Sequence, residues 1–182
     1  MDLSVLAREC DIITFHTPLN RNGKYKTFHL ADADFFAGLQ RKPFIVNTSR
    51  GEVIETLALL DALKTGRIRD AVIDTWENEP DIHPDLLQKF FGNPSYSRYS
   101  ADGKSNATRM ALEELCNFFH IQADFKIVPP ALPYMDYSSD PEEAFLQVYD
   151  PTRDSDALKR HPEEFEHLRG NYPLRREISF LP

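Results

Sequence analysis

The sequence predicts an α/β fold, with a parallel sheet flanked by helices and a small α+β segment at the carboxyl end. Three short apolar runs have the length of buried strands, and helical patterns separate them. Strands connected through helices pair in parallel, because each helix returns the chain to the same end of the sheet. After a proline-rich stretch, the chain continues into a tail with helical patterns of its own.

The strands are expected where the apolar runs are bounded by turn residues. The first run stops at His16-Thr17-Pro18, where Pro18 has no N–H to donate to a ladder. The second and third runs are equally short and apolar. The predicted strands cover residues 11–15, 44–47 and 71–74.

Helices are expected where apolar residues recur at helical spacing. The first has an Asp-rich start, the second ends at Gly66, and a Gly-Asn-Pro turn follows the third. The predicted helices cover residues 30–40, 55–63, 86–91 and 105–121, with the turn at residues 92–94.

Composition divides the chain into three parts. Residues 1–124 hold the predicted strands and the four helices between and after them. Residues 125–141 are rich in proline, which predicts a linker without regular helix. Residues 142–182 form the tail, with helices expected at residues 142–149 and 162–169 and a strand at residues 174–180.

The composition excludes several classes of protein. The chain has 182 residues, 41% of them hydrophobic, which suits one domain with a core, or one domain and an appendage. Its 21 Lys and Arg residues against 29 Asp and Glu residues give a net charge of -8, which disfavours nucleic acids and anionic membranes as partners. No apolar run approaches the ~20 residues that span a bilayer. Cys10 and Cys116 form neither a disulfide framework nor a metal-ligand cluster, so we expect reduced thiols in a cytoplasmic protein without a metal site.

Polar segments follow each predicted strand. In a parallel sheet the carboxyl ends of the strands lie along one edge, where ligands bind. A plain turn needs only Gly or Asn at these places, so chemically active side chains there indicate a site. The three segments are His16-Thr17-Pro18, Asn47-Thr48-Ser49-Arg50-Gly51 and Asp74-Thr75-Trp76-Glu77-Asn78-Glu79-Pro80.

Three charged residues in these segments could act on a ligand, and two of them, Arg50 and Asp74, have a structural alternative. Arg50 can present a planar fork to a carboxylate or phosphate, or it can be a surface residue that caps a helix. Asp74 can accept a hydrogen bond from a ligand amide, or it can be an N-cap or turn carboxylate. Glu79 can tune an acid/base histidine, whereas Glu77 is expected to be solvated.

The histidines and glycines limit the chemistry. His16 follows a strand, but a turn histidine bonded to the backbone is the commoner outcome there. The other histidines show no ligand spacing and are expected at the surface: His29, His83, His120, His161 and His167. None of the seven glycines forms a GxGxxG or Walker phosphate loop.

Taken together, these segments resemble the NAD-dependent D-2-hydroxyacid dehydrogenases and, within them, the 4-phosphoerythronate dehydrogenase family. The wider resemblance rests on the strings at residues 11–19, 46–51 and 73–80. The narrower one rests on the proline-rich connection and on the strings at residues 99–104, 148–150 and 165–177. The resemblance implies a partial Rossmann-like, NAD-binding domain at residues 1–124 and a dimerisation-domain-like tail at residues 142–182.

The resemblance also implies a role for each site residue. Arg50 matches the arginine that holds the substrate carboxylate, Glu79 the acid that pairs with the catalytic histidine, and Asp74 the contact to the nicotinamide amide. The segment His16-Thr17-Pro18 lines the cofactor site. The implied reaction is the oxidation of 4-phospho-D-erythronate, a small phosphorylated 2-hydroxy acid, to the 2-oxo acid in pyridoxal 5'-phosphate biosynthesis. The implied assembly is a homodimer formed through the tail.

Two departures from the family lead us to expect no activity from this chain alone. The chain starts just before the strand that would be fourth in a doubly wound sheet, so we expect an amino-terminally truncated domain that lacks its first βαβ half and the Gly-rich pyrophosphate loop. The family's His-Ile-Ala-Gly motif is replaced by Ser95-Tyr96-Ser97-Arg98. A serine hydroxyl cannot replace an imidazole as a base near neutral pH, so Ser95 at the catalytic position is predicted to be non-functional.

Two other functions stay open beside the enzyme. One is a non-catalytic remnant that self-associates, and the other is one half of a split dehydrogenase. In each case we expect the helix at residues 105–121 to expose Leu115, Phe118 and Phe119, which would otherwise pack on the other half. Exposed apolar side chains of this kind mark partner surfaces or aggregation hazards.

Overall fold

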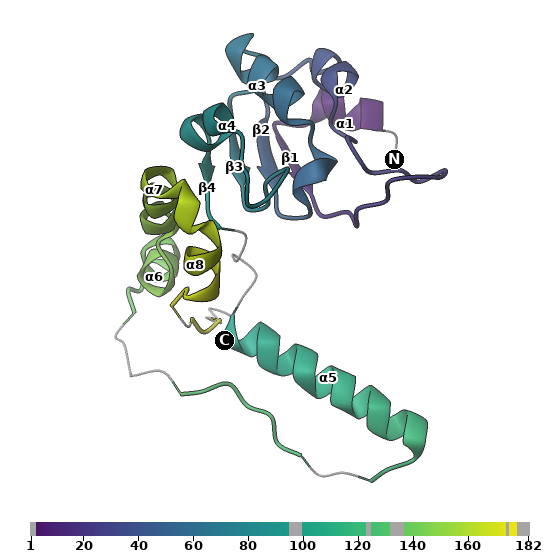
Figure 1. The fold of residues 1–182 in the computed structure, drawn as a ribbon, viewed down its shortest axis with the longest axis vertical. Helices are drawn as coiled ribbons and strands as arrows, with labels where there is room; N and C mark the ends of the chain where they lie inside the picture. Colours follow the sequence, from purple (N-terminus) through teal and green to yellow (C-terminus); the bar gives the residue numbers. More distant parts are fainter. Residues whose placement is uncertain (1–2, 95–99, 123–124, 132–136, 174, 178–182) are drawn as a thin grey trace. The chain divides into compact units, whose positions relative to one another are not determined.

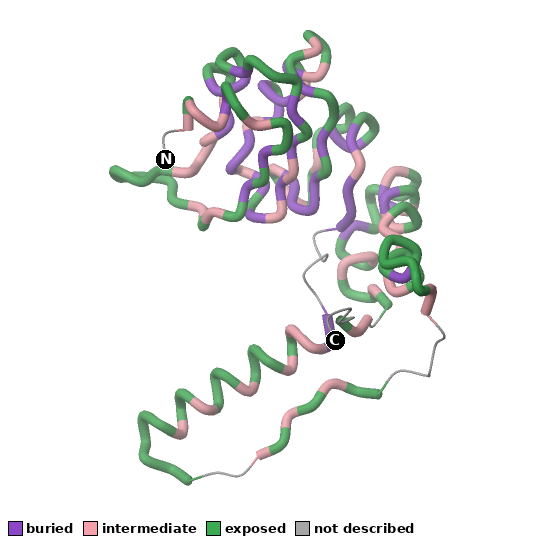
Figure 2. The backbone as a smooth tube through the Cα atoms, turned by 180° about the vertical axis from the view of Figure 1, so that it is seen from behind, coloured by how far each residue is buried: buried purple, intermediate pink, exposed green. Residues whose placement is uncertain are grey.

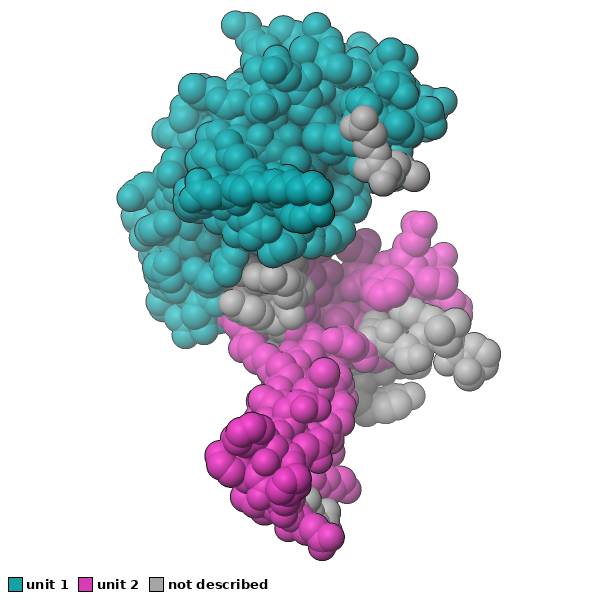
Figure 3. Space-filling model, turned by 90° about the vertical axis from the view of Figure 1, so that its right-hand side faces the viewer, with its two compact units in different colours: residues 1–95, 152–171 teal, residues 96–151, 172–182 magenta. Residues whose placement is uncertain are grey.

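A computed structural model gives the fold of the chain and describes residues 3–94, 100–122, 125–131, 137–173 and 175–177. The chain forms two compact units (Figure 3). Unit 1 contains residues 1–95 and 152–171, and unit 2 contains residues 96–151 and 172–182. The domain boundaries expected after residues 124 and 141 remain a prediction.

Unit 1 is built on a four-stranded parallel sheet, which confirms the predicted fold class (Figure 1). The strands lie in chain order and all neighbours are parallel: β1 Ile12–Phe15, β2 Phe44–Asn47, β3 Asp70–Ile73 and β4 Phe91–Gly92. The sequence does not predict β4, since it places Phe91 at the end of a helix and Gly92 in a turn. Two residues are too few for an apolar pattern, and it is pairing with Val72 and Ile73 that makes them a strand.

Short helices connect these strands. Their bounds are α1 Leu3–Glu9, α2 Ala33–Ala37, α3 Thr56–Lys64 and α4 Pro84–Lys89, with a 3-10 turn, η1, at Gly51–Val53. Asp32 caps α2 by accepting a 2.9 Å hydrogen bond from Phe35 N, as an Asp-rich start predicts. Gly66 has a φ of 68° and follows α3, in agreement with its expected role as an end signal.

The tail returns to unit 1 with α7 Pro151–Arg160, η2 Pro162–Glu164 and α8 Phe165–Gly170. Leu158 and Phe165 are buried in the core of unit 1, and Ser155 Oγ accepts a 3.4 Å hydrogen bond from Gly92 N of β4. The sequence predicts the helix at residues 162–169 but not α7. Most residues of α7 are polar, so its apolar side chains are too few to show a helical pattern.

Buried residues alternate with more exposed ones along β1, β2 and β3 (Figure 2). Side chains alternate along each strand, and one set lies in the core with side chains of α2, α3 and α4. This buried set includes Ile13, Phe15, Ile45, Ala71 and Ile73. On the opposite face, Ile12, Phe44 and Val72 are exposed. The described part of unit 1 therefore covers one face of the sheet.

Unit 2 contains α5 Ala101–Phe119 and α6 Pro141–Val148. The expected exposure of α5 is confirmed, because Leu115, Phe118 and Phe119 are 51%, 76% and 59% exposed. The strand expected at residues 174–180 is wrong where the structure describes it: Arg175–Glu177 instead binds the first turn of α5. The rest of that range lies outside the described residues. Across the helices that the structure describes, none combines the length and apolar composition needed to cross a membrane.

Candidate active site

The carboxyl ends of β1, β2 and β3 lie side by side, so the three polar segments begin at one edge of the sheet. Phe15, Asn47 and Ile73 are in register across the three strands. The residues that follow them therefore start from the same level of the sheet. Parallel pairing brings the segments together as the sequence predicts.

Asn47, the last residue of β2, organises the loop that follows it. Its side chain is buried and donates to Arg50 O (3.0 Å) and Thr75 O (3.4 Å). Its Oδ1 accepts from Ser49 N (3.2 Å) and Ser49 Oγ (2.9 Å), and its backbone carbonyl accepts from Asp74 N (2.9 Å). The sequence treats Asn47 only as the end of a strand. An amide at the last position of a buried strand is the signal that could have identified it, since a buried amide needs several partners.

Gly51 brings the β2 loop into direct contact with the β3 loop. A Cβ atom at this position would lie 1.9 Å from the carbonyl carbon of Trp76 and 2.2 Å from Glu77 N. Only a residue without a side chain allows the two backbones to approach so closely. The glycine thus fixes where Arg50 starts relative to the β3 loop.

Arg50 presents an exposed side chain at this edge. Its backbone is extended, with φ of -137° and ψ of 144°, and precedes η1. Its side chain does not cap that turn, which disfavours the capping alternative. Within the part of the chain that the structure describes, its guanidinium makes no hydrogen bond or ion pair. An arginine placed in this way can receive a carboxylate or phosphate from outside.

Asp74 and Glu79 lie on the loop after β3. Asp74 is 2% exposed and directly follows the strand, and it precedes no described helix as an N-cap. Glu79 Oε1 accepts a 2.6 Å hydrogen bond from Trp76 N, which holds its carboxylate against its own loop. Trp76 is itself buried and donates from Nε1 to Asn93 O at 2.7 Å. The loop is therefore held by the Glu79 carboxylate and by the buried Trp76 side chain.

Glu77 is not solvated, and in this respect the sequence-based expectation is wrong. Its Oε1 lies 2.6 Å from His29 Nε2, and its Oε2 accepts from Thr56 N at 3.0 Å. Burial raises the pKa of the Glu77 carboxyl, but the hydrogen bonds from Thr56 and His29 outweigh it, so the pKa lies below its ordinary value. His29, which is expected at the surface, is half-buried, with a side chain that is 28% exposed and is paired with Glu77. Glu77 and His29 are 48 residues apart, and no local pattern reveals their pairing.

The segment after β1 contributes a histidine and a threonine. His16 is exposed, and its Nδ1 lies 2.9 Å from Thr48 Oγ1 of the β2 loop, in place of the expected backbone contact. Thr17 Oγ1 is buried and has no hydrogen-bond partner among the described residues. Pro18 is exposed. The Thr17 hydroxyl is thus available to a ligand that enters this edge.

The structure does not place every predicted site residue. Ser95, with Tyr96, Ser97 and Arg98, lies outside the described residues. Among the residues that are described, no group of three or more His, Cys, Asp or Glu side chains could hold a metal ion.

Comparison with known proteins identifies the family. Residues 1–94, more than half of the chain, match the family described as the NAD binding domain of D-isomer specific 2-hydroxyacid dehydrogenases. The chain belongs to this family. Residues 130–182 of this dehydrogenase-family chain match a domain of unknown function. The resemblance seen in the sequence is confirmed, and NAD is the cofactor of the family.

Curated relatives narrow the resemblance. The erythronate-4-phosphate dehydrogenase of Bacteroides thetaiotaomicron is 60% identical over 178 residues, which are 96% of this chain and 51% of the relative. The erythronate-4-phosphate dehydrogenase of Edwardsiella ictaluri is 40% identical and is matched by 98% of this chain, again over 51% of its own length. The chain spans about half the length of the curated relatives that it matches.

Solved structures agree with the fold. The apo form of D-mandelate dehydrogenase from Rhodotorula graminis matches 72% of this chain and 39% of its own, with a TM-score of 0.58 and 27% identity. A glyoxylate reductase from Paecilomyes thermophila matches 63% of this chain and 34% of its own, with a TM-score of 0.57 and 26% identity. The parallel α/β architecture is thus shared with dehydrogenases and reductases of known structure.

Proposed function

We propose that this chain carries part of the active site of an NAD-dependent erythronate-4-phosphate dehydrogenase. The identity of 60% to an enzyme of that name supports the proposal. The observation that carries it is the exposed Arg50 guanidinium, which has no partner among the described residues and lies on a loop in close contact with the loop that holds Asp74 and Glu79. Oxidation of a 2-hydroxy acid by NAD needs a cation that binds the carboxylate, close to an acid/base group and to the nicotinamide.

Arg50 is proposed to hold the substrate carboxylate. Its planar fork can donate two parallel hydrogen bonds, which fix the orientation of the acid as well as its position. Asn47 and Gly51 fix the backbone on either side of Arg50, so that the fork starts from a defined place. The proposed substrate is erythronate 4-phosphate, oxidised at the hydroxyl carbon next to the carboxylate.

The same edge of the sheet fits the nicotinamide end of NAD. Thr17 Oγ1 is a buried hydroxyl without a partner among the described residues, and Asp74 is a buried carboxylate at the end of β3. Buried hydroxyls are normally hydrogen-bonded, so a polar ligand suits the position of Thr17. We assign Asp74 and the segment His16-Thr17-Pro18 to cofactor binding. When bound, NAD supplies the acceptor for the hydride.

Proton transfer is the step for which these residues are not equipped. Glu79, held by Trp76 N, is proposed as the acid that supports a catalytic histidine. Ser95 stands at the position of that histidine, and a hydroxyl does not accept a proton near neutral pH. The 182 residues also contain no GxGxxG loop. We therefore propose that this polypeptide alone neither binds NAD measurably nor turns over substrate.

A chimaera tests the proposal. The amino-terminal half of the Bacteroides thetaiotaomicron enzyme would be joined to this chain, and we expect NAD binding without turnover. Replacing Ser95-Tyr96-Ser97-Arg98 by His-Ile-Ala-Gly is then expected to give oxidation of erythronate 4-phosphate. In that active chimaera, Arg50→Gln should lower kcat/KM by on the order of 100-fold. The control is Arg41→Gln, which removes an exposed arginine paired with Asp11 at the opposite end of the strands.

Three results would contradict the proposal. Calorimetry that detects NAD binding to the 182-residue chain alone would disprove the expected need for the other half. Turnover by the chimaera that keeps Ser95 would disprove the role given to that position. A chimaera with His-Ile-Ala-Gly that binds NAD but does not oxidise erythronate 4-phosphate would disprove the proposed substrate.

We also propose a homodimer, formed through the tail at residues 142–182, in the cytoplasm. The exposed apolar side chains of α5, which belongs to the same unit as residues 142–151 and 172–182 of the tail, support self-association. The free thiols of Cys10 and Cys116 are in keeping with a reducing compartment. Analytical ultracentrifugation is expected to show a dimer, and a monomer at all concentrations would contradict this assembly.

A further inference from the structure

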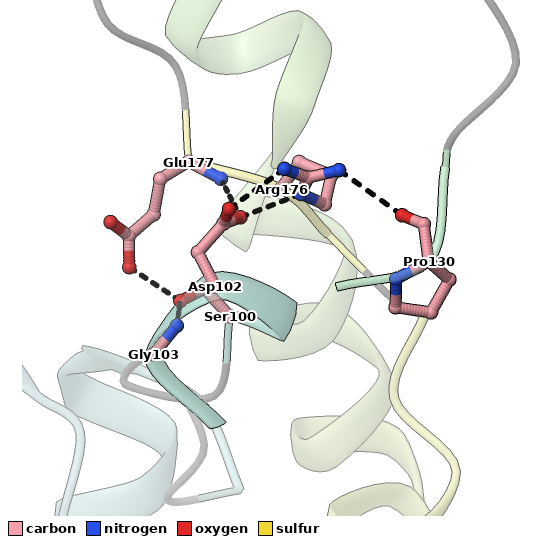
Figure 4. A network of polar contacts seen from close by, with 6 residues as sticks. All are labelled: Ser100, Asp102, Gly103, Pro130, Arg176 and Glu177. Atoms are coloured by element: carbon pink, nitrogen blue, oxygen red, sulfur yellow. Dashed lines mark hydrogen bonds and ion pairs between the residues drawn. The ribbon is translucent and has the colours of Figure 1, made fainter. Parts of the chain in front are cut away.

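The last described residues of the chain bind the first turn of α5 (Figure 4). Arg176 donates from Nε to Asp102 Oδ2 and from Nη2 to Asp102 Oδ1, each at 2.8 Å. This is the parallel, two-bond geometry in which an arginine and a carboxylate bind most strongly and most specifically. The third nitrogen of the guanidinium, Nη1, donates to Pro130 O at 3.1 Å. All three guanidinium nitrogens of Arg176 therefore donate hydrogen bonds.

Backbone hydrogen bonds accompany the ion pair. Glu177 N donates to Asp102 Oδ2 at 2.8 Å, and Ala101 N donates to Arg175 O at 2.9 Å. The second of these satisfies an N–H in the first turn of α5, which has no partner inside the helix. The tail thus supplies a hydrogen-bond acceptor that the helix itself lacks.

The N-cap residue of α5 belongs to the same network. Ser100 Oγ accepts from Gly103 N at 2.8 Å and donates to Glu177 Oε1 at 2.5 Å. The cap and the tail therefore hold each other, as Figure 4 shows. Two cation–π contacts support the arrangement: Lys104 Nζ lies 4.7 Å from the Tyr172 ring centroid, and Arg175 Cζ lies 4.2 Å from that of Tyr149.

Electrostatics agree with the geometry. The hydrogen bonds from Arg176 hold the pKa of Asp102 below its ordinary value. The same contact raises the pKa of the Arg176 guanidinium. The pair is partly shielded, with exposed side-chain fractions of 32% for Arg176 and 20% for Asp102. The Arg109–Glu113 pair further along α5 is more exposed, at 41% and 45%.

We propose that the carboxyl-terminal segment is a positioning element that fixes the start of α5. We call it the tail clasp, and it consists of Tyr172, Arg175, Arg176 and Glu177. This gives a role to part of the region that matches a domain of unknown function. The proposal does not depend on the enzymatic function of this chain.

Amide hydrogen exchange of the full chain tests the clasp. Arg176→Gln and Asp102→Asn are expected to make the Ala101 and Glu177 amides exchange roughly 10-fold faster, because charged hydrogen bonds that hold the segment are lost. Amides in the middle of α5 should keep their rates. The matched control is Glu113→Gln, which breaks the exposed ion pair of the same helix and should leave Ala101 unchanged.

Restoring the contact distinguishes positioning from a general loss of structure. The exchanged pair Asp102→Arg with Arg176→Asp should protect Ala101 better than either single variant does. Arg176→Lys keeps the charge but cannot form the two-bond fork together with the Pro130 contact. The Ala101 amide of this variant should therefore exchange at a rate between those of the unmodified chain and Arg176→Gln. The fluorescence of the single tryptophan, Trp76, checks that unit 1 of each variant is folded, and unchanged exchange in the middle of α5 checks that this helix of unit 2 is folded.

Three outcomes would overturn the proposal. The first is unchanged exchange at Ala101 and Glu177 in Arg176→Gln, or in Arg176→Lys where the glutamine variant does not fold. The second is a charge-exchanged pair that is no better protected than the single variants. The third is protection restored by mixing the Asp102→Arg chain with the Arg176→Asp chain, since the clasp would then join two molecules.

Discussion

The edge of the sheet in unit 1 and the first turn of α5 in unit 2 are both fixed by polar contacts, but they are fixed in different ways. At the sheet edge, buried side chains such as Asn47 bind the backbone of their own or a neighbouring loop. At α5, a partly exposed ion pair joins residues 74 positions apart. The difference teaches that a site can be rigid through local burial, whereas an isolated helix end depends on distant segments of the chain.

The largest effect is expected from Gly51→Ala, which challenges the rigidity of the sheet edge directly. The new Cβ would collide with the Trp76 carbonyl carbon, and backbone cannot yield as a flexible side chain can. We expect the free energy of unfolding of unit 1 to fall by about 4 kcal/mol or more. Thermal unfolding followed by Trp76 fluorescence measures it. Gly170→Ala is the control, because no described atom outside its own helix and chain neighbours lies within 4 Å of its Cβ position.

Asn47→Ala should have the next largest effect. It removes both donors to Arg50 O and Thr75 O and the acceptor for Ser49, so that several buried polar groups lose their partner. A loss of about 3 kcal/mol in the free energy of unfolding is expected. Asn22→Ala, at an exposed position, should be close to neutral. Equal stability of the two variants in urea would show that local burial does not hold this edge.

A smaller, pH-dependent effect is expected at Glu77. Because the pKa of Glu77 is lowered in the folded chain, its contribution is fully present above the ordinary value of 4.5 and is lost as the pH falls through the lower folded value. On acidification, the free energy of unfolding of the unmodified chain should therefore fall more steeply than that of Glu77→Gln. The exposed Glu9→Gln variant should follow the unmodified chain. If the free energy of unfolding falls equally with pH in all three proteins, the contribution of the Glu77 carboxylate is ruled out.

The smallest effect is expected from Arg41→Gln, which measures how much an exposed ion pair contributes to the stability of unit 1. Arg41 and Asp11 lie 2.8 Å apart, but their side chains are 52% and 75% exposed. Water screens such a pair, so the free energy of unfolding should change by less than about 0.5 kcal/mol. A loss as large as that of Asn47→Ala would erase the contrast between buried and exposed contacts.

The sequence predicts those parts of the molecule that depend on neighbouring residues. Apolar runs predict β1, β2 and β3, and their parallel pairing places Arg50, Asp74 and Glu79 at one edge. The sequence cannot predict the partners of Glu77, because His29 is 48 residues away. No local pattern shows which distant group a charged side chain will contact.

The same limit applies to β4 and to the tail. Phe91 and Gly92 form a strand only because β3 lies beside them. The expected strand near the carboxyl end fails at Arg175–Glu177, where side chains that look suitable for a ladder bind the start of a helix instead. Both outcomes are decided by tertiary contacts that override local preference.

The position of β1 has a consequence for handling the protein. In the described sheet β1 pairs with β2 alone, and its other edge offers backbone donors and acceptors to an incoming strand. Ile12, which is 63% exposed, adds apolar surface at the same place. This edge can accept a fifth strand from an extended polypeptide, so a purified sample should be prone to aggregates that grow through Ile12–Phe15.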